Sequence, residues 1–236
     1  EILKRFAFPS DFIKNLTPKK TDNEYLSLWR NLNSALLKKI DYYDYSSNLT
    51  LFAIKELIQS VPSQSALFLA NSNTIRHSQF FINKELNFFC NRGINGIDGS
   101  LSAAVGYACN YDHLTFLIIG DLSFFYDMNA LWYQSISPNL RILLLNNNGG
   151  GIFKSLPGLN ESDAVKELII THNKVTAKGW AESVGLSYFY ADDNSFTMHL
   201  LEILTAPSET PILLELNCNA ENAKKEYTQF IEYLRK

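Results

Sequence analysis

The chain has 236 residues, of which 46% are apolar and 19% are charged, and 21 Lys and Arg face 24 Asp and Glu for a formal net charge of −3. This length and composition predict one globular domain, or at most two small ones, whose core needs no disulfide or metal to hold it. The balanced charge excludes the class of proteins that bind nucleic acid through clustered Lys and Arg.

The apolar runs are short and the cysteines are unpaired in the sequence. Apolar runs such as residues 116–119 and 143–145 fall far below the ~20 residues of a membrane helix, so no membrane partner is expected. Cys90, Cys109 and Cys218 are widely spaced without a CxxC pair, which predicts a reducing cytoplasm and no zinc site. Four scattered histidines are expected at the surface or as core residues with satisfied hydrogen bonds: His77, His113, His172 and His199.

The first 23 residues predict an irregular lead-in, because they contain Pro9, Pro18 and the pair Lys19-Lys20. The domain proper is therefore expected over residues 24–236. The N-terminal residues carry neither an initiator Met nor the pattern of a signal peptide, so we expect the chain to be a piece of a longer polypeptide.

From residue 24 onward, apolar blocks alternate with helical patterns. Strands are predicted at 66–70, 114–119, 142–145, 212–216 and, as the weakest candidate, 186–190. Helices are predicted near 28–40, 52–58, 102–108, 127–135, 176–184, 196–204 and 220–234. Continuous apolar blocks are typical of parallel strands covered on both faces. The pattern therefore predicts a doubly wound α/β domain with a mostly parallel sheet.

The residues that follow two of these strands carry the chemistry, since ligands bind beyond the carboxyl ends of parallel strands. Asp121 follows the strand at 114–119, and the asparagines 146–148 with the glycines 149–151 follow the strand at 142–145. The interval from Asp121 to Asn147 is about one strand–helix–strand unit, so both side chains are expected at one edge of the sheet. Carboxylate, amide and carbonyl oxygens suit Mg²⁺ that also holds phosphate oxygens.

Each of these pieces alone is also ordinary turn chemistry, because Gly-Asp after a strand and Asn-Asn-Gly-Gly are common in turns. Together, in order and at this spacing, they favour a diphosphate–metal site. The residues alone leave Asn146, Asn147 and Asn148 as equal candidates for the metal ligand.

Two of the six arginines, Arg76 and Arg92, fall in loops expected next to this site. A guanidinium group binds a carboxylate through two parallel hydrogen bonds, which Lys cannot imitate. Either arginine alone could equally pair with a structural Asp or a helix end. As a pair beside the site, they favour a substrate that carries carboxylates.

The motifs resemble those of the thiamine-diphosphate enzymes. Gly120-Asp121 followed by residues 146–148 is similar to the Gly-Asp-Gly…Asn-Asn signature of that family, although Leu122 replaces the third Gly. With residues 91–93, 96–99 and 147–150, the chain resembles the branch that serves menaquinone biosynthesis. The resemblance runs from about residue 66 to residue 156, and more loosely to the C-terminus.

The resemblance implies thiamine diphosphate and Mg²⁺, or Mn²⁺, as cofactors. It implies that Asp121, Asn147 and the Gly149 carbonyl hold the metal, that Leu122 and Ser123 lie against the diphosphate, and that Ile97 holds the cofactor bent. The cofactor-binding residues that it implies are Gly96, Ile97, Asp121, Leu122, Ser123, Asn147, Gly149, Gly150 and Ile152. It assigns Ser72, Arg76 and Arg92 to substrate carboxylates, and Phe153 and Leu156 to an apolar wall beside the thiazolium. Without the resemblance, the last two would be interpreted as core residues.

The activity that the resemblance implies is decarboxylation of 2-oxoglutarate and transfer of the succinyl unit to isochorismate. The Glu that activates the cofactor is expected from a separate N-terminal pyrimidine-binding domain, on a partner subunit of a homo-oligomer. No catalytic residue is therefore expected in this chain, which should be inactive alone. A non-catalytic α/β interaction or regulatory module is the alternative. A Rossmann-like nucleotide-binding domain ranks last, because GxGxxG and a phosphate-loop Lys-Ser/Thr pair are both absent.

Overall fold

The computed structural model describes residues 23–81, 86–133, 135–156, 159, 162–218 and 220–236. The predicted lead-in therefore lies, except for Asn23, outside the described residues. The chain divides into two units, residues 1–43 and 44–236. The first contributes one described helix, α3 (Asn23–Tyr42), which confirms the helix expected there. A domain boundary after residue 23 stays a prediction.

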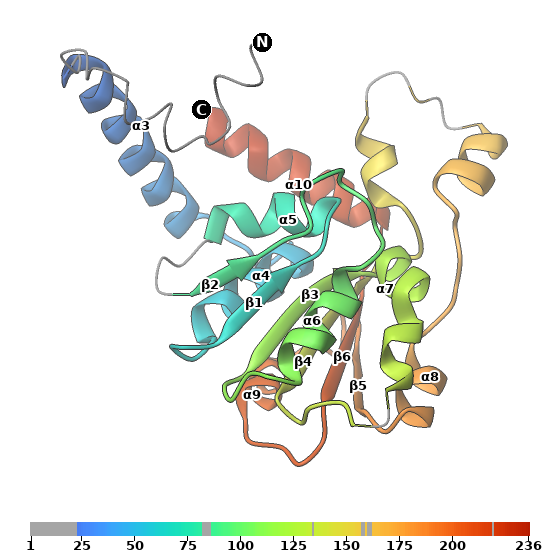
Figure 1. The fold of residues 1–236 in the computed structure, drawn as a ribbon. Coiled ribbons are helices and arrows are strands. Elements are labelled where there is room, and N and C mark those ends of the chain that lie inside the picture. Colours follow the sequence, from blue (N-terminus) through green and yellow to red (C-terminus); the bar gives the residue numbers. More distant parts are fainter. Residues whose placement is uncertain (1–22, 82–85, 134, 157–158, 160–161, 219) are drawn as a thin grey trace, which may run out of the picture. The chain divides into compact units, whose positions relative to one another are not determined.

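The second unit is built on one six-stranded sheet in the order β2-β1-β3-β4-β6-β5, in which every neighbouring pair is parallel (Figure 1). The strands are β1 (Ala66–Leu69), β2 (Asn87–Phe89), β3 (Thr115–Gly120), β4 (Leu140–Asn146), β5 (Ser187–Ala191) and β6 (Ile212–Asn217). This confirms the doubly wound α/β fold and all five predicted strands. The sequence did not predict β2, because this edge strand is short and begins with an exposed polar residue.

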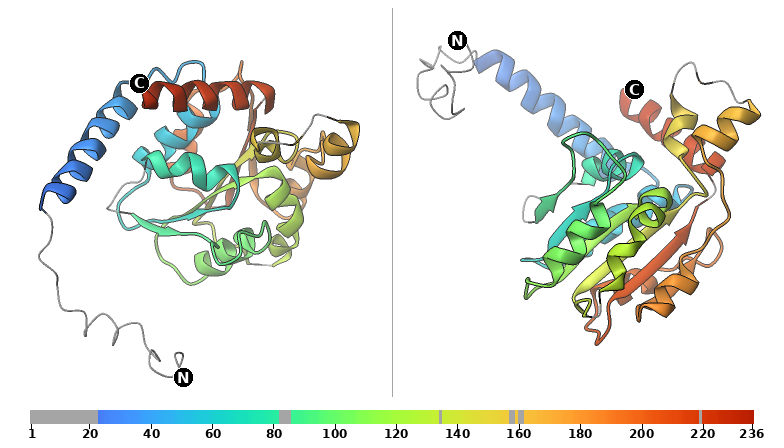
Figure 2. Two further views of the ribbon diagram at one scale, coloured as in Figure 1. Left: turned by 90° about the horizontal axis from the view of Figure 1, so that it is seen from above. Right: turned by 45° about the vertical axis from the view of Figure 1, so that its right-hand side comes forward.

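Helices cover both faces of the sheet, with α6, α7 and α8 on one face and α4 and α9 on the other (Figures 1 and 2). The helices of this unit are α4 (Leu49–Ser60), α5 (Asn73–Ser78), α6 (Ser100–Ala108), α7 (Asp121–Asp127), α8 (Lys178–Ser183), α9 (Met198–Thr205) and α10 (Ala220–Arg235). Single turns of other helix types are η1 (Gln79–Phe81), η2 (Met128–Trp132), η3 (Gly151–Ser155) and the π-helical η4 (Val165–Ile169).

The helix predicted at 127–135 was wrong. An α-helix instead begins at Asp121, directly after β3, and ends at Asp127, where a 3₁₀ turn takes over. Two tertiary contacts hold α7 in this position. Phe124 is fully buried in the core, and the Asp127 carboxylate accepts hydrogen bonds from the Ser102 N–H (2.8 Å) and hydroxyl (2.5 Å) in α6. Neither contact is visible in a local sequence pattern.

Alternate residues of the central strands pack against opposite helix layers. Leu117 and Ile119 of β3 join the cluster formed with Leu101 and Ala104 of α6, and all four are fully buried. Each such Leu or Ile contributes about 1.5–3 kcal/mol through removal from water. This packing fixes the strands and, with them, the positions at which the loops beyond their carboxyl ends begin.

One buried carboxylate ties the sheet together close to those ends. Glu215 of β6 is fully buried and accepts hydrogen bonds from Asn146 Nδ2 of β4 (2.6 Å), the Ala177 N–H before α8 (2.8 Å) and the Tyr188 hydroxyl of β5 (2.8 Å). Burial and the Glu215 charge together raise the pKa of Tyr188, so this phenol stays a neutral donor. Three donors in three elements thus converge on one carboxylate.

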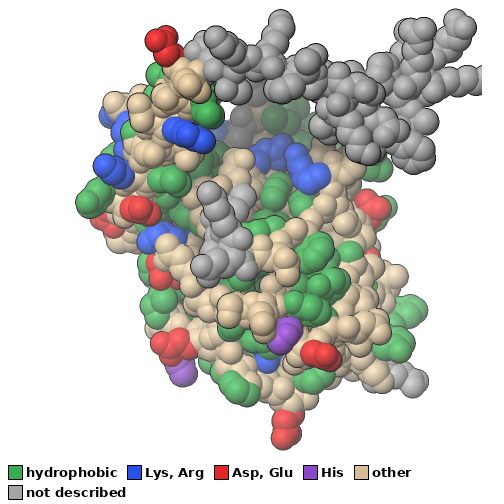
Figure 3. Space-filling view, turned by 60° about the vertical axis from the view of Figure 1, so that its left-hand side comes forward, with side chains coloured by type: hydrophobic (Ala, Val, Ile, Leu, Met, Phe, Trp, Pro, Cys, Tyr) green, Lys and Arg blue, Asp and Glu red, His purple; other side chains and the backbone are tan. Residues whose placement is uncertain are grey.

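The surface mixes charges of both signs with exposed aromatic side chains. On the face drawn in Figure 3, basic and acidic side chains are intermingled. Tyr126, Trp132 and Tyr133, from α7 and the turn after it, are each more than 60% exposed. Within the described part of the chain, no helix combines the length and the apolarity that crossing a bilayer requires.

Replacement of Glu215 tests its role in the sheet. We expect Glu215→Ala to lower the free energy of unfolding by about 3 kcal/mol, because it leaves buried donors without an acceptor. Urea unfolding measures the change. The matched control, Glu209→Ala, removes an exposed Glu that precedes the same strand and should leave stability unchanged. Equal stabilities of the two variants would contradict this role.

Candidate functional site

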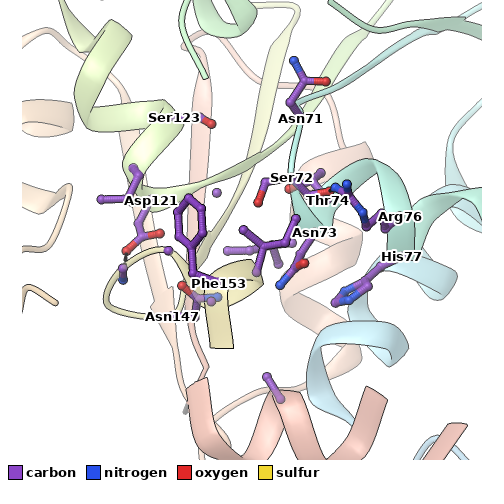
Figure 4. Close-up of a pocket in the computed structure, with 18 of the residues that line it drawn as sticks. Asn71, Ser72, Asn73, Thr74, Arg76, His77, Asp121, Ser123, Asn147 and Phe153 are labelled. Atoms are coloured by element: carbon purple, nitrogen blue, oxygen red, sulfur yellow. Dashed lines mark hydrogen bonds between the residues drawn. The ribbon is translucent and has the colours of Figure 1, made fainter. Parts of the chain in front are cut away.

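A cavity of about 520 Å³ lies at the carboxyl end of the sheet, where the chain leaves β1, β2, β3, β4 and β6 (Figure 4). All but one of the site residues predicted from the sequence line it. They are Ser72, Arg76, Arg92, Ile97, Asp121, Leu122, Ser123, Asn147, Gly149, Gly150, Ile152, Phe153 and Leu156. The exception is Gly96, which is not among the residues that line the cavity. The structure thus brings together residues that the sequence placed in separate loops, while their binding roles stay predictions.

Asp121 lies at the start of α7 and is only 2% exposed. Its Oδ2 accepts a 2.7 Å hydrogen bond from the Gly149 N–H, drawn in Figure 4, which joins the ends of β3 and β4. Burial raises the pKa of Asp121 to about 6, although hydrogen bonds from Leu122, Gly149 and Asn173 oppose this shift. A buried carboxylate of this kind is stabilised by a nearby cation.

The three asparagines after β4 have different environments, which distinguishes among candidates that the sequence left equal. The Asn146 side chain is used in the sheet, because it donates to Glu215 and to the Val175 carbonyl and accepts from the Asn148 N–H. Asn148 adopts a left-handed backbone (φ 61°) and does not line the cavity. Asn147 does line it, and its buried Oδ1 has no hydrogen-bond partner among the described residues. The geometry therefore singles out Asn147.

The glycine turn lets two other segments approach closely. Gly149 has φ +140°, and a side-chain Cβ there would lie 2.6 Å from the Ile170 carbonyl oxygen. A Cβ on Gly150 would lie 2.7 Å from the Phe153 ring. Glycine is therefore required at position 149, whereas a side chain at position 150 would displace the Phe153 ring, which faces the cavity.

Ser72 and Arg76 lie at the junction of β1 and α5. Ser72 has a left-handed φ of 70°, and its side chain makes no capping hydrogen bond to α5. Its carbonyl accepts a 2.7 Å hydrogen bond from Arg76 Nη1, which orients the guanidinium. The expectation that Arg76 lies in a loop was wrong, because residues Asn73–Ser78 form a short helix. This helix is mostly polar and too short to show an apolar periodicity in the sequence.

Asn71 organises the loop that carries Arg92. Its Nδ2 donates to the Asn91 carbonyl (2.7 Å) and the Gly96 carbonyl (2.6 Å), while its Oδ1 accepts from Arg92 Nη1 (3.2 Å). The hydrogen bond from Asn71 thus fixes the backbone at Gly96, and the next residue, Ile97, lines the cavity. Asn71 was visible as a polar residue after a strand, but nothing local indicated these partners.

Apart from Arg76, the sequence did not predict the part of the lining that comes from α5 and α10. These residues are Asn73, Thr74, His77, Ala223, Lys224 and Tyr227. His77 is buried, and its Nδ1 has no partner among the described residues, so the expectation of satisfied hydrogen bonds was wrong for this histidine. The helix α10 was predicted, but its approach to this edge of the sheet is a tertiary property.

The donor set at the Asp121–Asn147 edge fits Mg²⁺. It offers a carboxylate, an amide oxygen without a partner and the carbonyl of Gly149, which are the hard oxygen ligands that this ion prefers. No cluster of three or more His, Cys, Asp or Glu suited to a metal occurs among the described residues. An ion here would need further ligands from a phosphate or water.

Comparison with known proteins gives one consistent result. The chain is 43% identical to the 2-succinyl-5-enolpyruvyl-6-hydroxy-3-cyclohexene-1-carboxylate synthase of Bacteroides thetaiotaomicron over 217 residues, or 89% of the chain and 38% of that protein. Synthases of the same name from Phocaeicola vulgatus and Flavobacterium johnsoniae are each 40% identical over 99% and 88% of the chain, and 40% and 38% of their own lengths. The chain therefore spans about two fifths of these curated relatives. No family model matches it.

The raised pKa of Asp121 predicts a pH dependence of stability in the absence of metal. The folded-state pKa of about 6 exceeds the ordinary value of 3.8, so the contribution of Asp121 to stability is fully present below pH 3.8 and is lost as the pH rises through 6. We expect wild type to lose about 2 kcal/mol between pH 4 and pH 7 relative to Asp121→Asn. Urea unfolding of both proteins from pH 4 to pH 7 measures the difference. Parallel pH profiles would show that Asp121 ionises normally.

Proposed function

Because this chain is homologous over most of its length to 2-succinyl-5-enolpyruvyl-6-hydroxy-3-cyclohexene-1-carboxylate synthases, we propose that it is the C-terminal, diphosphate-binding domain of such a synthase. The reaction is that of a carboligating transferase of menaquinone biosynthesis. The structural observation that carries the proposal is the buried, unpartnered Oδ1 of Asn147 in the same cavity as Asp121.

In this proposal Asp121, Asn147 and the Gly149 carbonyl hold Mg²⁺, or Mn²⁺, which binds the diphosphate. Leu122 and Ser123, at the start of α7, lie against the diphosphate. When bound, thiamine diphosphate supplies a nucleophilic carbon and accepts the electrons released by decarboxylation. The chain's own part would be to hold, orient and desolvate this group, with Ile97 against it. Gly149 lets the backbone at Ile170 approach the turn closely.

The substrates in this proposal are 2-oxoglutarate and isochorismate, which both carry carboxylates. Arg76 and Arg92 bind them, and both guanidinium groups are already oriented by hydrogen bonds to Ser72 and Asn71. The Ser72 hydroxyl lines the cavity beside them. Phe153 and Leu156 form the apolar wall that excludes water from the reacting carbon.

The proposal also needs a second protein surface. The activating Glu comes from an N-terminal pyrimidine-binding domain, on a partner subunit of a homo-oligomer. Asp121 is the only carboxylate among the described residues that line the cavity, and the exposed Tyr126, Trp132 and Tyr133 offer an apolar surface for association. The three cysteines are free thiols, which fits a cytoplasmic location.

Calorimetry of cofactor binding tests the metal assignment. We expect Mg²⁺-dependent binding of thiamine diphosphate to be lost in Asp121→Ala and weakened at least tenfold in Asn147→Ala, because each removes one oxygen ligand. The control Asp112→Ala removes an exposed Asp remote from the cavity and should bind as wild type does. Unchanged affinity in Asp121→Ala would refute the metal assignment, and no binding by wild type would favour a non-catalytic module.

Exchange of the thiazolium C2 proton tests whether the chain is active alone. With this chain, Mg²⁺ and thiamine diphosphate, we expect exchange at the rate of free cofactor, since no Glu of the described residues lines the cavity. Nuclear magnetic resonance after quenching in D₂O measures the rate. Exchange well above the free rate would overturn the proposed need for a partner domain.

A further inference from the structure

The C-terminal helix α10 forms one wall of the cavity through Ala223, Lys224 and Tyr227. Residues three and four apart share one face of a helix, so Ala223, Tyr227 and Phe230 lie in one stripe. Phe230 is fully buried, and its ring centroid lies 5.1 Å from that of Phe80. Phe230 thus anchors α10 in the core. The N-terminal part of the helix, which includes Lys224, lies at the cavity.

The same helix is fixed beside Arg76. The Tyr227 ring lies 4.6 Å from the His77 ring of α5, and the charge of Arg76 lowers the pKa of Tyr227 against the larger, raising effect of burial. Burial and Arg76 lower the pKa of His77 to about 4, so this imidazole is neutral near pH 7. The positive charge of this wall is therefore carried by Arg76 and Lys224.

The described lining of the cavity has an excess of positive charge. Arg76, Arg92 and Lys224 contribute three cations, none of which is in an ion pair within the described residues. The sole carboxylate of the described lining, Asp121, already accepts the Gly149 N–H. A bound anion compensates this excess of positive charge.

We propose that Lys224 is a third carboxylate-binding residue of this cavity, so that a dicarboxylate is held with one carboxylate on the arginines and the other on Lys224. The identity of the dicarboxylate, 2-oxoglutarate, rests on the proposed function, whereas the charge arrangement does not. The C-terminal helix thereby takes part in substrate selection: a monocarboxylate leaves Lys224 without a partner.

The test compares two neighbouring lysines. Lys224→Gln removes the charge that lines the cavity, and Lys225→Gln removes the same charge from the next, exposed position. We titrate 2-oxoglutarate, and pyruvate as the monocarboxylate, into the full chain and follow binding by calorimetry. Lys224→Gln should weaken 2-oxoglutarate binding about tenfold, as loss of a charged hydrogen bond does, and leave pyruvate binding unchanged. Lys225→Gln should match wild type, and Lys224→Arg should keep most of the affinity.

Several outcomes would overturn the inference. These are equal 2-oxoglutarate affinities of Lys224→Gln and Lys225→Gln, no preference of wild type for 2-oxoglutarate over pyruvate, or no 2-oxoglutarate binding by wild type at millimolar concentration. Thiamine-diphosphate binding, measured on the same variants, separates the two proposals. If that binding is absent while 2-oxoglutarate binding still depends on Lys224, the proposed function fails and the carboxylate site stands.

Discussion

The hydrogen bond from the Gly149 N–H to the Asp121 carboxylate joins the two loops on which the cavity depends. It is possible because β3 and β4 are parallel neighbours whose register pairs Gly120 with Leu145, so both chains leave the sheet side by side. The pairing of β4 with β6 brings Asn146 to the buried Glu215, and the next residue, Asn147, lines the cavity. Two strand pairings thus set the two sides of the candidate metal site.

The cavity has two edges of different charge, one that suits a cation and one that suits an anion. At one edge lie a buried Asp and an unpartnered amide oxygen, which a divalent ion would stabilise in the proposed function. At the other, basic side chains from α5, the loop after β2 and α10 lack acidic partners among the described residues. A metal-bound diphosphate and a carboxylate substrate would satisfy both edges.

The proposed function treats this cavity as part of an active site. Its relatives are more than twice as long, and in the proposal the activating Glu comes from another domain. The part proposed for this chain is binding and orientation, which need a rigid frame. The network of Glu215 and the hydrogen bonds of Asn71 supply that rigidity, because each fixes several loops through one buried side chain.

The sequence by itself determined the five main strands, the α/β class and the meeting of Asp121 with the asparagine turn, because parallel strands bring their carboxyl ends to one edge. It also indicated Arg76 and Arg92, since both fall in segments expected beside the candidate site. Only the tertiary structure shows which of Asn146, Asn147 and Asn148 lines the cavity, because side-chain direction depends on which atoms the neighbouring strand offers. Packing likewise decided the short elements β2 and α5 and the approach of α10, with Lys224, to the cavity. The periodicity of a sequence indicates that a helix is amphipathic, but it does not indicate which element its apolar face contacts.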